Sequence, residues 1–471
     1  MNPIESIASA PASKNYRVAE QRCTFLNYMA IVPKRVLASR NLHGSLLPLV
    51  LLGYTGRKLT RGHTNLSVLF LLRAVRLCVF LPLATSIVLA QQSLNNSEAL
   101  SYRPHDALNL TAFNHFYNLD YDRSVQEFEQ ILQRHQDDPF AVNHLLSAVL
   151  FRELYRMGAL NTGEYANDSF IHAAHRPADA KAQQRIKDLV HRALALEEKR
   201  LKTNPNDVDA LYARGVTRGL FATYTALVER AWFSALRNAV GARHDHERVL
   251  ELAPQDVQAK LIVGAHNYVI GSLPWGAKVA ASVVGLTGHK EKGLKYLQEC
   301  AAGNGETSVD AKIVLVLFLR REHRYDEALK FARELIPRYP QDVLIALEEG
   351  NLLRAAGRDQ EAVSVYRKIW QAGREGKYLA LHYEVASLSL ADLFRSRKDY
   401  SGAAGAYEQV PQAANADPEV LQKANLGAGE MYDLLQKRDL ALNKYQAVVA
   451  LNSSTPPAET ARKLMKEAYR E

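Results

Sequence analysis

The sequence predicts an all-α fold, a solenoid of consecutive helical hairpins, on two observations. Ala328 and Ala362 are 34 residues apart, and each lies in the second of two amphipathic helical patterns. Alternation of apolar and polar residues, which is typical of half-exposed β-strands, is almost absent. A period of this size indicates helical repeats, because two helices of about 12 to 14 residues and two short turns fill it, and one hairpin cannot bury its own apolar face.

Two consecutive hairpins, residues 309–376, resemble the tetratricopeptide repeat. That family's unit has a small residue at position 8, Ala at position 20 and an aromatic residue at position 24. The second hairpin has at these positions, in turn, Gly350, Ala362 and Tyr366. The first hairpin has Ala328 at position 20 and Pro340 at its end, while Val316 and Ala332 replace the small and the aromatic residue. Small residues let two helices approach closely, and Pro ends the second helix.

The resemblance implies an all-α, right-handed superhelical solenoid of about eight hairpins between residues 107 and 455. Residues 309–455 form its regular repeats, and residues 107–303 form irregular repeats with insertions. The final segment, residues 456–471, is one amphipathic helix. A solenoid needs such a helix to cap the apolar face of its last hairpin.

Two insertions, residues 158–178 and 271–288, interrupt the irregular repeats. Loops of this length in a compact array are usually functional or flexible. The second insertion holds an apolar run, residues 277–286, which is too short to span a bilayer. We predict that this run is a helix buried among its neighbours rather than one that touches a membrane. Trp275 is likewise expected to cover the adjacent helix pair rather than to anchor a partner.

The net charge of +9 comes from the start of the chain. Residues 1–90 hold eleven of the 59 Lys and Arg residues but only two of the 50 Asp and Glu residues, so the remainder is balanced. A balanced solenoid has no global field that attracts DNA or RNA. The sequence therefore predicts no nucleic-acid partner.

A charged and apolar segment, residues 66–90, predicts export. Arg73 and Arg76 precede an apolar run that ends in Ala90, a small residue typical of a cleavage site. Cleavage of this signal peptide would start the mature chain at Gln91, and the protein would be periplasmic or secreted by a bacterium.

The same segment has a second interpretation, an uncleaved membrane anchor, which would make the protein a membrane-anchored assembly factor. Residues 1–65 are then an N-terminal extension, unless the start is assigned too far upstream, and residues 91–106 are expected to be a flexible lead-in. Cleavage would leave Cys300 as the only cysteine and exclude an intramolecular disulfide. Its place in a repeat predicts a buried structural thiol.

No catalytic motif is found: the sequence has no Walker loop, no GxGxxG behind a strand, no GxSxG and no HExxH. His172 and His175 have a spacing that can place two imidazoles on one helical turn, but few carboxylates lie near them in the sequence. His246 stands at an aromatic packing position, which favours a structural role. We therefore predict no enzymatic activity, no metal and no cofactor. The rival interpretation is an enzyme or metal site in residues 158–300.

The resemblance also implies a ligand groove, because the first helices of this family line the concave surface. Position 12 of three successive units is Arg320, Arg354 and Arg395, and Arg321 follows the first of them. Asn351, at position 9, resembles the side chain with which family members grip an extended peptide backbone. Arg suits carboxylates because it donates two parallel hydrogen bonds. We expect these five residues to bind a protein or extended peptide; the alternative is solvated surface charge.

Overall fold

All regular elements of the computed structural model are helices in the part of the chain that it describes, which is residues 102–160, 175–283, 286–378, 382–414 and 416–471. This confirms the predicted all-α class. The described residues belong to one compact unit, Cys78–Glu471. None of their helices is long and apolar enough to cross a membrane.

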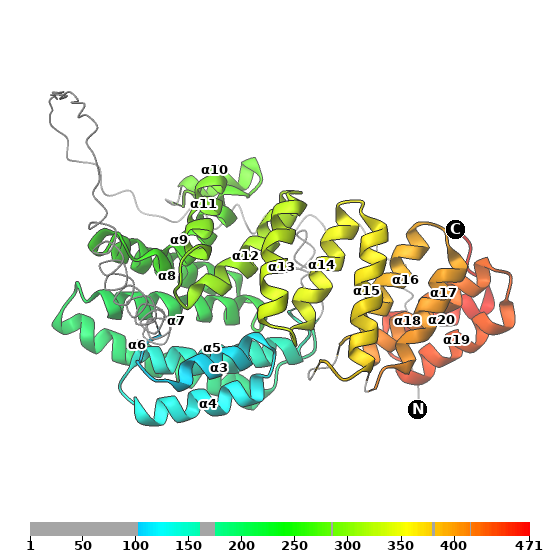
Figure 1. The fold of residues 1–471 in the computed structure, drawn as a ribbon, viewed down its shortest axis with the longest axis horizontal. Coiled ribbons are helices and arrows are strands. Elements are labelled where there is room, and N and C mark those ends of the chain that lie inside the picture. Colours follow the sequence, from blue (N-terminus) through cyan, green and yellow to red (C-terminus); the bar gives the residue numbers. More distant parts are fainter. Residues whose placement is uncertain (1–101, 161–174, 284–285, 379–381, 415) are drawn as a thin grey trace, which may run out of the picture. The chain divides into compact units, whose positions relative to one another are not determined.

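Eight hairpins of two helices each follow one another along these residues (Figure 1). The irregular half contains α3 (Leu108–Tyr117) with α4 (Tyr121–Arg134), α5 (Pro139–Arg156) with α6 (Ala180–Thr203), α7 (Val208–Leu227) with α8 (Trp232–Leu252), and α9 (Lys260–Gly271) with α11 (Lys290–Ala301). The regular half contains α12 (Thr307–Arg321) with α13 (Tyr325–Arg338), α14 (Val343–Ala355) with α15 (Asp359–Arg374), α16 (Glu384–Ser396) with α17 (Tyr400–Gln409), and α18 (Pro418–Leu434) with α19 (Arg438–Leu451). Outside the pairs stand α10 (Trp275–Val283), the terminal helix α20 (Pro456–Lys466) and two 3₁₀ turns, η4 (Val257–Ala259) and η5 (Val410–Gln412).

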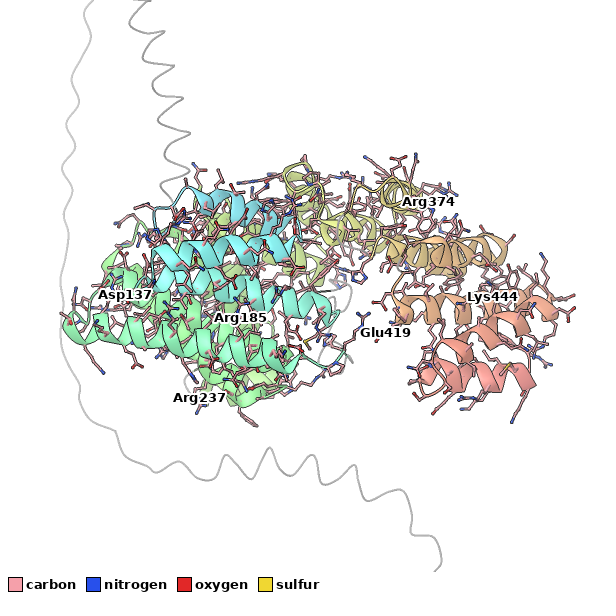
Figure 2. The ribbon with its side chains drawn as sticks, turned by 90° about the horizontal axis from the view of Figure 1, so that it is seen from below. Asp137, Arg185, Arg237, Arg374, Glu419 and Lys444 are labelled. Carbon is pink, nitrogen blue, oxygen red and sulfur yellow. The ribbon has the colours of Figure 1, made fainter. Side chains whose placement is uncertain are left out.

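The helix pairs pack in the predicted register. Ala328 and Ala362 are completely buried. A Cβ atom added to Gly350 would lie 2.4 Å from Cε1 of Tyr366, so the small residue at position 8 makes room for the aromatic residue at position 24. Charged side chains such as Arg374 stand on the outer side of the helices (Figure 2). The spacing between the small and the aromatic residues in the sequence thus reflects direct contact between the two helices of a hairpin.

The irregular hairpins obey the same rule with other residues. A Cβ atom on Gly215 would overlap the ring of His246, which is buried and stacks on Tyr212. Gly264 and Gly293 meet backbone to backbone in the next hairpin. The structural role predicted for His246 is therefore confirmed.

The first helices of the regular half end in residues of left-handed backbone conformation. His323, Gly357, Lys398 and Gln436 have φ between 58° and 73°. The following residue donates its N–H to a carbonyl in the last turn, as Arg358 does to Leu353 at 2.9 Å. Gly adopts this conformation without steric cost, whereas other residues do not.

Replacing Lys398 with Gly is therefore expected to raise the free energy of unfolding by up to about 1 kcal/mol, because a left-handed residue with a Cβ atom costs roughly that much. The Lys398 side chain is largely exposed and its contact with Glu471 is 3.8 Å long, so little is lost with it. Urea unfolding measures the change, and Gly357→Ala, which adds the same steric cost, should be less stable than wild type. A destabilised Lys398→Gly variant would contradict this account.

The structure corrects two expectations about exposure. Within the lead-in expected to be flexible, Tyr102 and Pro104 are buried, and Tyr102 stacks on Phe113. Trp275 does not cover the helix pair, because its side chain is 82% exposed, and Val279 on the same helix is also exposed. The predicted burial of the apolar run is wrong at Lys278, Val279 and Ser282 of α10, whose side chains are exposed.

The first hairpin packs against helices that are about 200 residues further along the chain. The Tyr117 hydroxyl donates a hydrogen bond to Oδ1 of Asp310 at 3.0 Å, and Asn118 accepts one from the backbone N–H of Gln341 at 3.0 Å. At the other end of the chain, α20 covers the apolar side of α19 as a cap, with Ala458 and Ala461 completely buried.

Candidate functional site

The predicted groove residues lie along three successive first helices and bond from each helix to the next. Arg320 of α12 reaches Glu348 of α14, Arg354 of α14 reaches the backbone carbonyl of Asp392 in α16, and Arg395 of α16 reaches Glu430 of α18. We call these three contacts the arginine ladder. The structure therefore brings the position-12 arginines onto one row, as the repeat geometry predicts.

The first rung of the ladder is deeply buried. Nη1 of Arg320 lies 2.9 and 2.8 Å from the two carboxylate oxygens of Glu348, whose side chain is completely buried. Asn351 donates a longer bond of 3.3 Å to the same carboxylate. A buried ion pair of this kind is costly to break, because the remaining charge has no water to solvate it.

The third rung is similarly closed. Nη1 of Arg395 lies 2.5 Å from Glu430, and Nη2 donates to the hydroxyl of Tyr469 at 3.0 Å. Burial raises the pKa of the Glu430 carboxyl, and the charge of Arg395 only partly offsets this effect. Arg395 is thus committed to contacts within the chain on both sides of its guanidinium group.

Tyrosines of the second helices donate to the same row. The hydroxyl of Tyr366 donates to Asn351 at 2.8 Å, that of Tyr407 to Asp392 at 2.5 Å, and that of Tyr445 to Asp433 at 2.8 Å. Each pair joins the two helices of one hairpin. The aromatic residue at position 24 therefore fills the core and also satisfies a polar side chain of the groove.

Arg354 is the most open member of the row. Its hydrogen bond to the carbonyl of Asp392 is 3.5 Å long, and the side chain is partly exposed. Arg321 is also partly exposed, at the end of α12. Burial opposes ionisation of Glu322, but hydrogen bonds from Lys290 and Tyr268 and the charge of Arg321 outweigh it and lower the pKa of that carboxyl.

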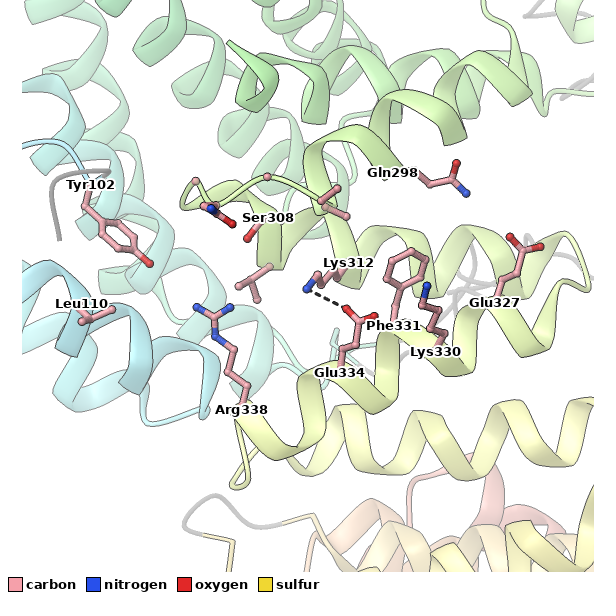
Figure 3. Close-up of a pocket in the computed structure, with 16 residues that line it drawn as sticks. Tyr102, Leu110, Gln298, Ser308, Lys312, Glu327, Lys330, Phe331, Glu334 and Arg338 are labelled. Atoms are coloured by element: carbon pink, nitrogen blue, oxygen red, sulfur yellow. Dashed lines mark ion pairs between the residues drawn. The ribbon is translucent and has the colours of Figure 1, made fainter. Parts of the chain in front are cut away.

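A cavity of about 590 Å³ lies between the first hairpin, the end of α11 and the helices α12 and α13, and no residue of the row lines it (Figure 3). Its lining is a mixture of apolar and charged side chains, among them Tyr102, Phe331, Lys330 and Arg338. Lys312 and Glu334 on its wall form an ion pair of 3.0 Å. Sequence reasoning missed this cavity, because its walls come from segments that no local pattern connects.

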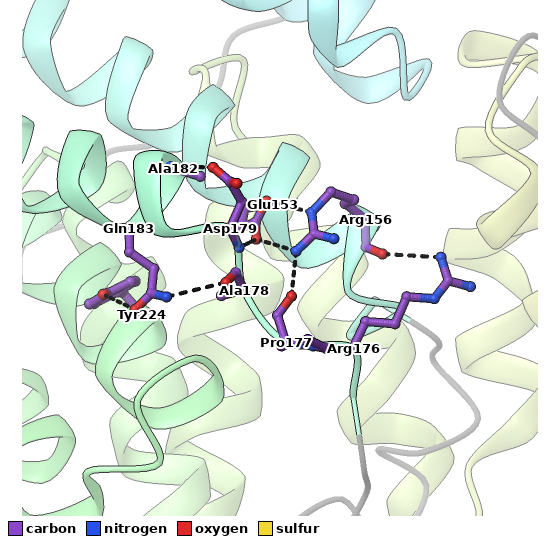
Figure 4. Close-up of polar contacts among 9 residues, drawn as sticks. All are labelled: Glu153, Arg156, Arg176, Pro177, Ala178, Asp179, Ala182, Gln183 and Tyr224. Carbon is purple, nitrogen blue, oxygen red and sulfur yellow. Dashed lines mark hydrogen bonds and ion pairs between the residues drawn. The ribbon is translucent and has the colours of Figure 1, made fainter. Parts of the chain in front are cut away.

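The insertion at 158–178 is fixed at its end by a buried carboxylate (Figure 4). Glu153 accepts hydrogen bonds from Arg156 at 2.7 Å and from the backbone N–H of Asp179 at 2.6 Å, and Arg156 also donates to the carbonyl of Pro177. These contacts link α5 to the start of α6.

The rival metal site finds no support in the part of the chain that the structure describes. His172 lies outside the described residues, and no group of three or more His, Cys, Asp and Glu side chains within them could hold a metal ion. Cys300 is buried beside the hydroxyl of Thr307. Burial raises the pKa of its thiol to about 11, so the thiol stays protonated at neutral pH.

The most perturbed carboxyl of the irregular half is that of Glu197 on α6. Its side chain is completely buried, and it accepts one hydrogen bond, from Thr217 at 2.6 Å. Burial raises its pKa to about 7, in spite of that bond and of two nearby arginines. Because the pKa of this carboxyl is higher in the folded than in the unfolded chain, its neutral form stabilises the folded chain at low pH. This contribution to the free energy of unfolding is lost as the pH rises through 7.

Glu197→Gln is therefore expected to remove a pH dependence of roughly 2 kcal/mol between pH 5 and pH 8, where wild type becomes less stable as the carboxyl ionises. Chemical denaturation at several pH values measures this difference. Glu198→Gln, one residue away on the exposed side of α6, is the matched control and should keep the wild-type profile. Parallel profiles for Glu197→Gln and wild type would show that this carboxyl does not titrate as described.

The residues 1–65 and the predicted signal segment 66–90 lie outside the described residues. Comparisons with protein-family models and with curated protein sequences gave no match. Among solved structures, a human IFIT1 dimer with PPP-AAAA is 13% identical and covers 79% of this chain and 82% of its own, with a TM-score of 0.36. PilF of Pseudomonas aeruginosa is 15% identical, covers 55% of this chain and 99% of its own, and has a TM-score of 0.32.

A tetratricopeptide repeat protein from Parabacteroides merdae is 14% identical and covers 64% of this chain and 99% of its own, with a TM-score of 0.29. These scores are too low for the likenesses to say anything about what this chain does. The fold follows from the hairpins of the chain itself. Gly350 faces Tyr366 and Ala362 is buried between helices, as the repeat pattern requires. The described part of the chain is a tetratricopeptide-like helical solenoid.

Proposed function

We propose that this protein is a non-catalytic scaffold that binds an extended segment of a partner protein along α12, α14 and α16. The observation that carries this proposal is the contrast within the arginine ladder. Arg320 and Arg395 are held by buried or half-buried carboxylates, whereas Arg354 has one long contact to a backbone carbonyl. Arg354 therefore has donors left for a ligand.

The chemistry of the row favours a partner segment that carries an acidic side chain beside an extended backbone. The nearby carboxylates of Asp392 and Asp433 accept hydrogen bonds from tyrosines of their own hairpins, so their charges are already engaged. Asn351 lies one helical turn before Arg354, and besides its bonds to Glu348 and Tyr366 its amide can donate one more hydrogen bond and accept one more from peptide groups. Together they make a site for a carboxylate and a peptide group about one turn apart.

Arg354→Gln is expected to weaken partner binding by about tenfold or more, because the loss of one charged hydrogen bond costs roughly 1.5 to 3 kcal/mol. The free energy of unfolding should change by less than about 0.5 kcal/mol, since the contact within the chain is long. The measurement is capture of partners from the native envelope fraction, with thermal melting of each variant.

The matched control is Arg333→Gln, an exposed arginine of α13 whose carboxylate partner, Glu349, lies on α14. It should capture as wild type does. Equal capture by Arg354→Gln would remove the proposed binding row, and a large drop in its melting temperature would assign Arg354 to packing.

We also propose that the protein acts outside the cytoplasm, exported by residues 66–90 and beginning at Gln91 in its mature form. The support is the Arg-flanked apolar run that ends in Ala90. N-terminal sequencing of the protein from the envelope tests this proposal. Residues 1–65 found still attached would favour the membrane-anchored alternative.

A further inference from the structure

Two short segments hold most of the exposed large apolar side chains of the described residues. Nine such side chains are exposed, and six of them lie in residues 232–236 and 269–279. We call these six the aromatic edge: Trp232, Phe233, Leu236, Val269, Trp275 and Val279. Single exposed apolar residues are ordinary, but a cluster of them marks an interaction surface.

The two segments lie at the same end of neighbouring hairpins. His246 of α8 contacts the carbonyl of Ala259 at 3.3 Å, and Arg243 contacts His266 of α9 at 3.2 Å. Arg243 lies nearer the start of α8 than His246 does, and its partner His266 lies further along the chain than Ala259, the partner of His246. The two helices are therefore antiparallel. The start of α8 and the end of α9 therefore point the same way, and Figure 1 shows α10 just beyond this end of α9.

Each segment presents apolar and basic side chains together on one helix face. On α10, Trp275, Lys278 and Val279 are exposed at helical spacing. At the start of α8, Phe233 and Arg237 are exposed, and Figure 2 shows Arg237 on the outer surface. Aromatic rings beside Lys or Arg are the composition of surfaces that lie in a membrane interface.

The charge of the two segments has one sign. Residues 230–244 contain three Arg and no Asp or Glu, and residues 257–290 contain three Lys and no Asp or Glu. The chain after residue 90 is balanced as a whole, so this local excess is not a consequence of composition. Arg243, Lys260 and Lys290 form ion pairs with Glu247, Glu299 and Glu322. Arg237 and Lys278 are exposed beside the edge, and their charges are complementary to an anionic surface.

We propose that the aromatic edge docks on the surface of a bilayer that contains anionic lipids. Trp275 and Phe233 enter the region of the lipid headgroups, while Arg237 and Lys278 remain beside the phosphates. The edge residues of α8 lie at its start, and Trp275 and Val279 lie on the short helix α10. This docking leaves the arginine ladder free, because the ladder runs along α12, α14 and α16.

The fluorescence of tryptophan tests this docking in the full chain. The protein has three Trp residues, of which Trp232 and Trp275 belong to the edge and Trp370 is nearly buried. Vesicles of phosphatidylcholine with phosphatidylglycerol should shift the emission to the blue, and lipids brominated on their acyl chains should quench it. Vesicles of phosphatidylcholine alone and high salt should both weaken the effect. Residues 1–101 contain no Trp, so binding through the N-terminal segment does not produce this signal by itself.

Phe233→Ser/Val279→Ser keeps all three Trp residues. It should raise the lipid concentration needed for half-maximal quenching by about tenfold, because it removes apolar area that the protein buries in the bilayer surface when it docks. Both side chains are exposed, so folding should be unaffected. The matched control is Leu440→Ser/Leu451→Ser, which removes two exposed apolar side chains of α19 and should behave as wild type does.

Arg237→Gln/Lys278→Gln should abolish the preference for anionic vesicles. Unchanged emission on vesicles, with or without binding through residues 66–90, would overturn the proposal. A blue shift that grows with protein concentration in the absence of lipid would overturn it as well, since it would make the edge a contact between copies of this chain.

Discussion

Replacing Ala362 with Trp is expected to lower the free energy of unfolding by about 3 kcal/mol or more. Ala362 is completely buried on α15, which packs against α14. The same hairpin has no room even for a Cβ atom at Gly350, which would overlap Tyr366. An indole at Ala362 must therefore separate the two helices or force neighbouring side chains out of their preferred rotamers.

Urea unfolding of the variant measures this effect. Ser364→Trp, two residues further along the same helix and exposed, is the matched control and should change the stability by less than about 0.5 kcal/mol. Ala328→Trp in the preceding hairpin should behave as Ala362→Trp does, because that alanine is also completely buried. If Ala362→Trp unfolds at the same urea concentration as wild type, the assigned repeat register is wrong.

The register of the hairpins could be predicted from the sequence because it depends on local spacing. Gly350 and Tyr366 are close in the chain, and their contact is fixed by one turn and two helices. The same is true of Gly215 and His246, where a histidine takes the aromatic position. A contact of the same kind joins Gly429 and Tyr445 in a later hairpin, so a periodic pattern is enough to reveal it.

The environment of the groove could not be predicted in the same way. The arginines of the row are visible in the sequence, and Glu430 stands at a groove position of the following unit. The pairing of Arg320 with Glu348 and of Arg395 with Glu430 is not visible, because each pair joins two different units. The contact between Tyr117 and Asp310 spans 193 residues and has no local pattern at all. Hydrophobic spacing alone also could not show that α10 is exposed, since a short apolar run fits a buried or a surface helix equally well.

Replacing Arg320 with Ala is expected to destabilise the protein by roughly 3 to 5 kcal/mol. The reason is the partner: the carboxylate of Glu348 is completely buried, and Nη1 of Arg320 contacts both of its oxygens. The bond from Asn351 to the same carboxylate, at 3.3 Å, is longer than either contact of Arg320. This expectation differs from that for a solvated arginine, which contributes about 0 to 1 kcal/mol.

A double-mutant cycle separates the ion pair from simple packing. Glu348→Gln alone should also destabilise the protein, because it leaves the guanidinium of Arg320 facing a neutral amide. Arg320→Met/Glu348→Met should recover much of the lost stability, since apolar residues of similar volume replace the buried pair and leave no unpaired charge. Arg333→Ala, which breaks the more exposed pair with Glu349, is the matched control and should cost no more than about 1 kcal/mol. If Arg320→Ala costs as little as this control, the buried rung does not stabilise the solenoid, and Arg320 would then join Arg354 as a residue free to bind a ligand.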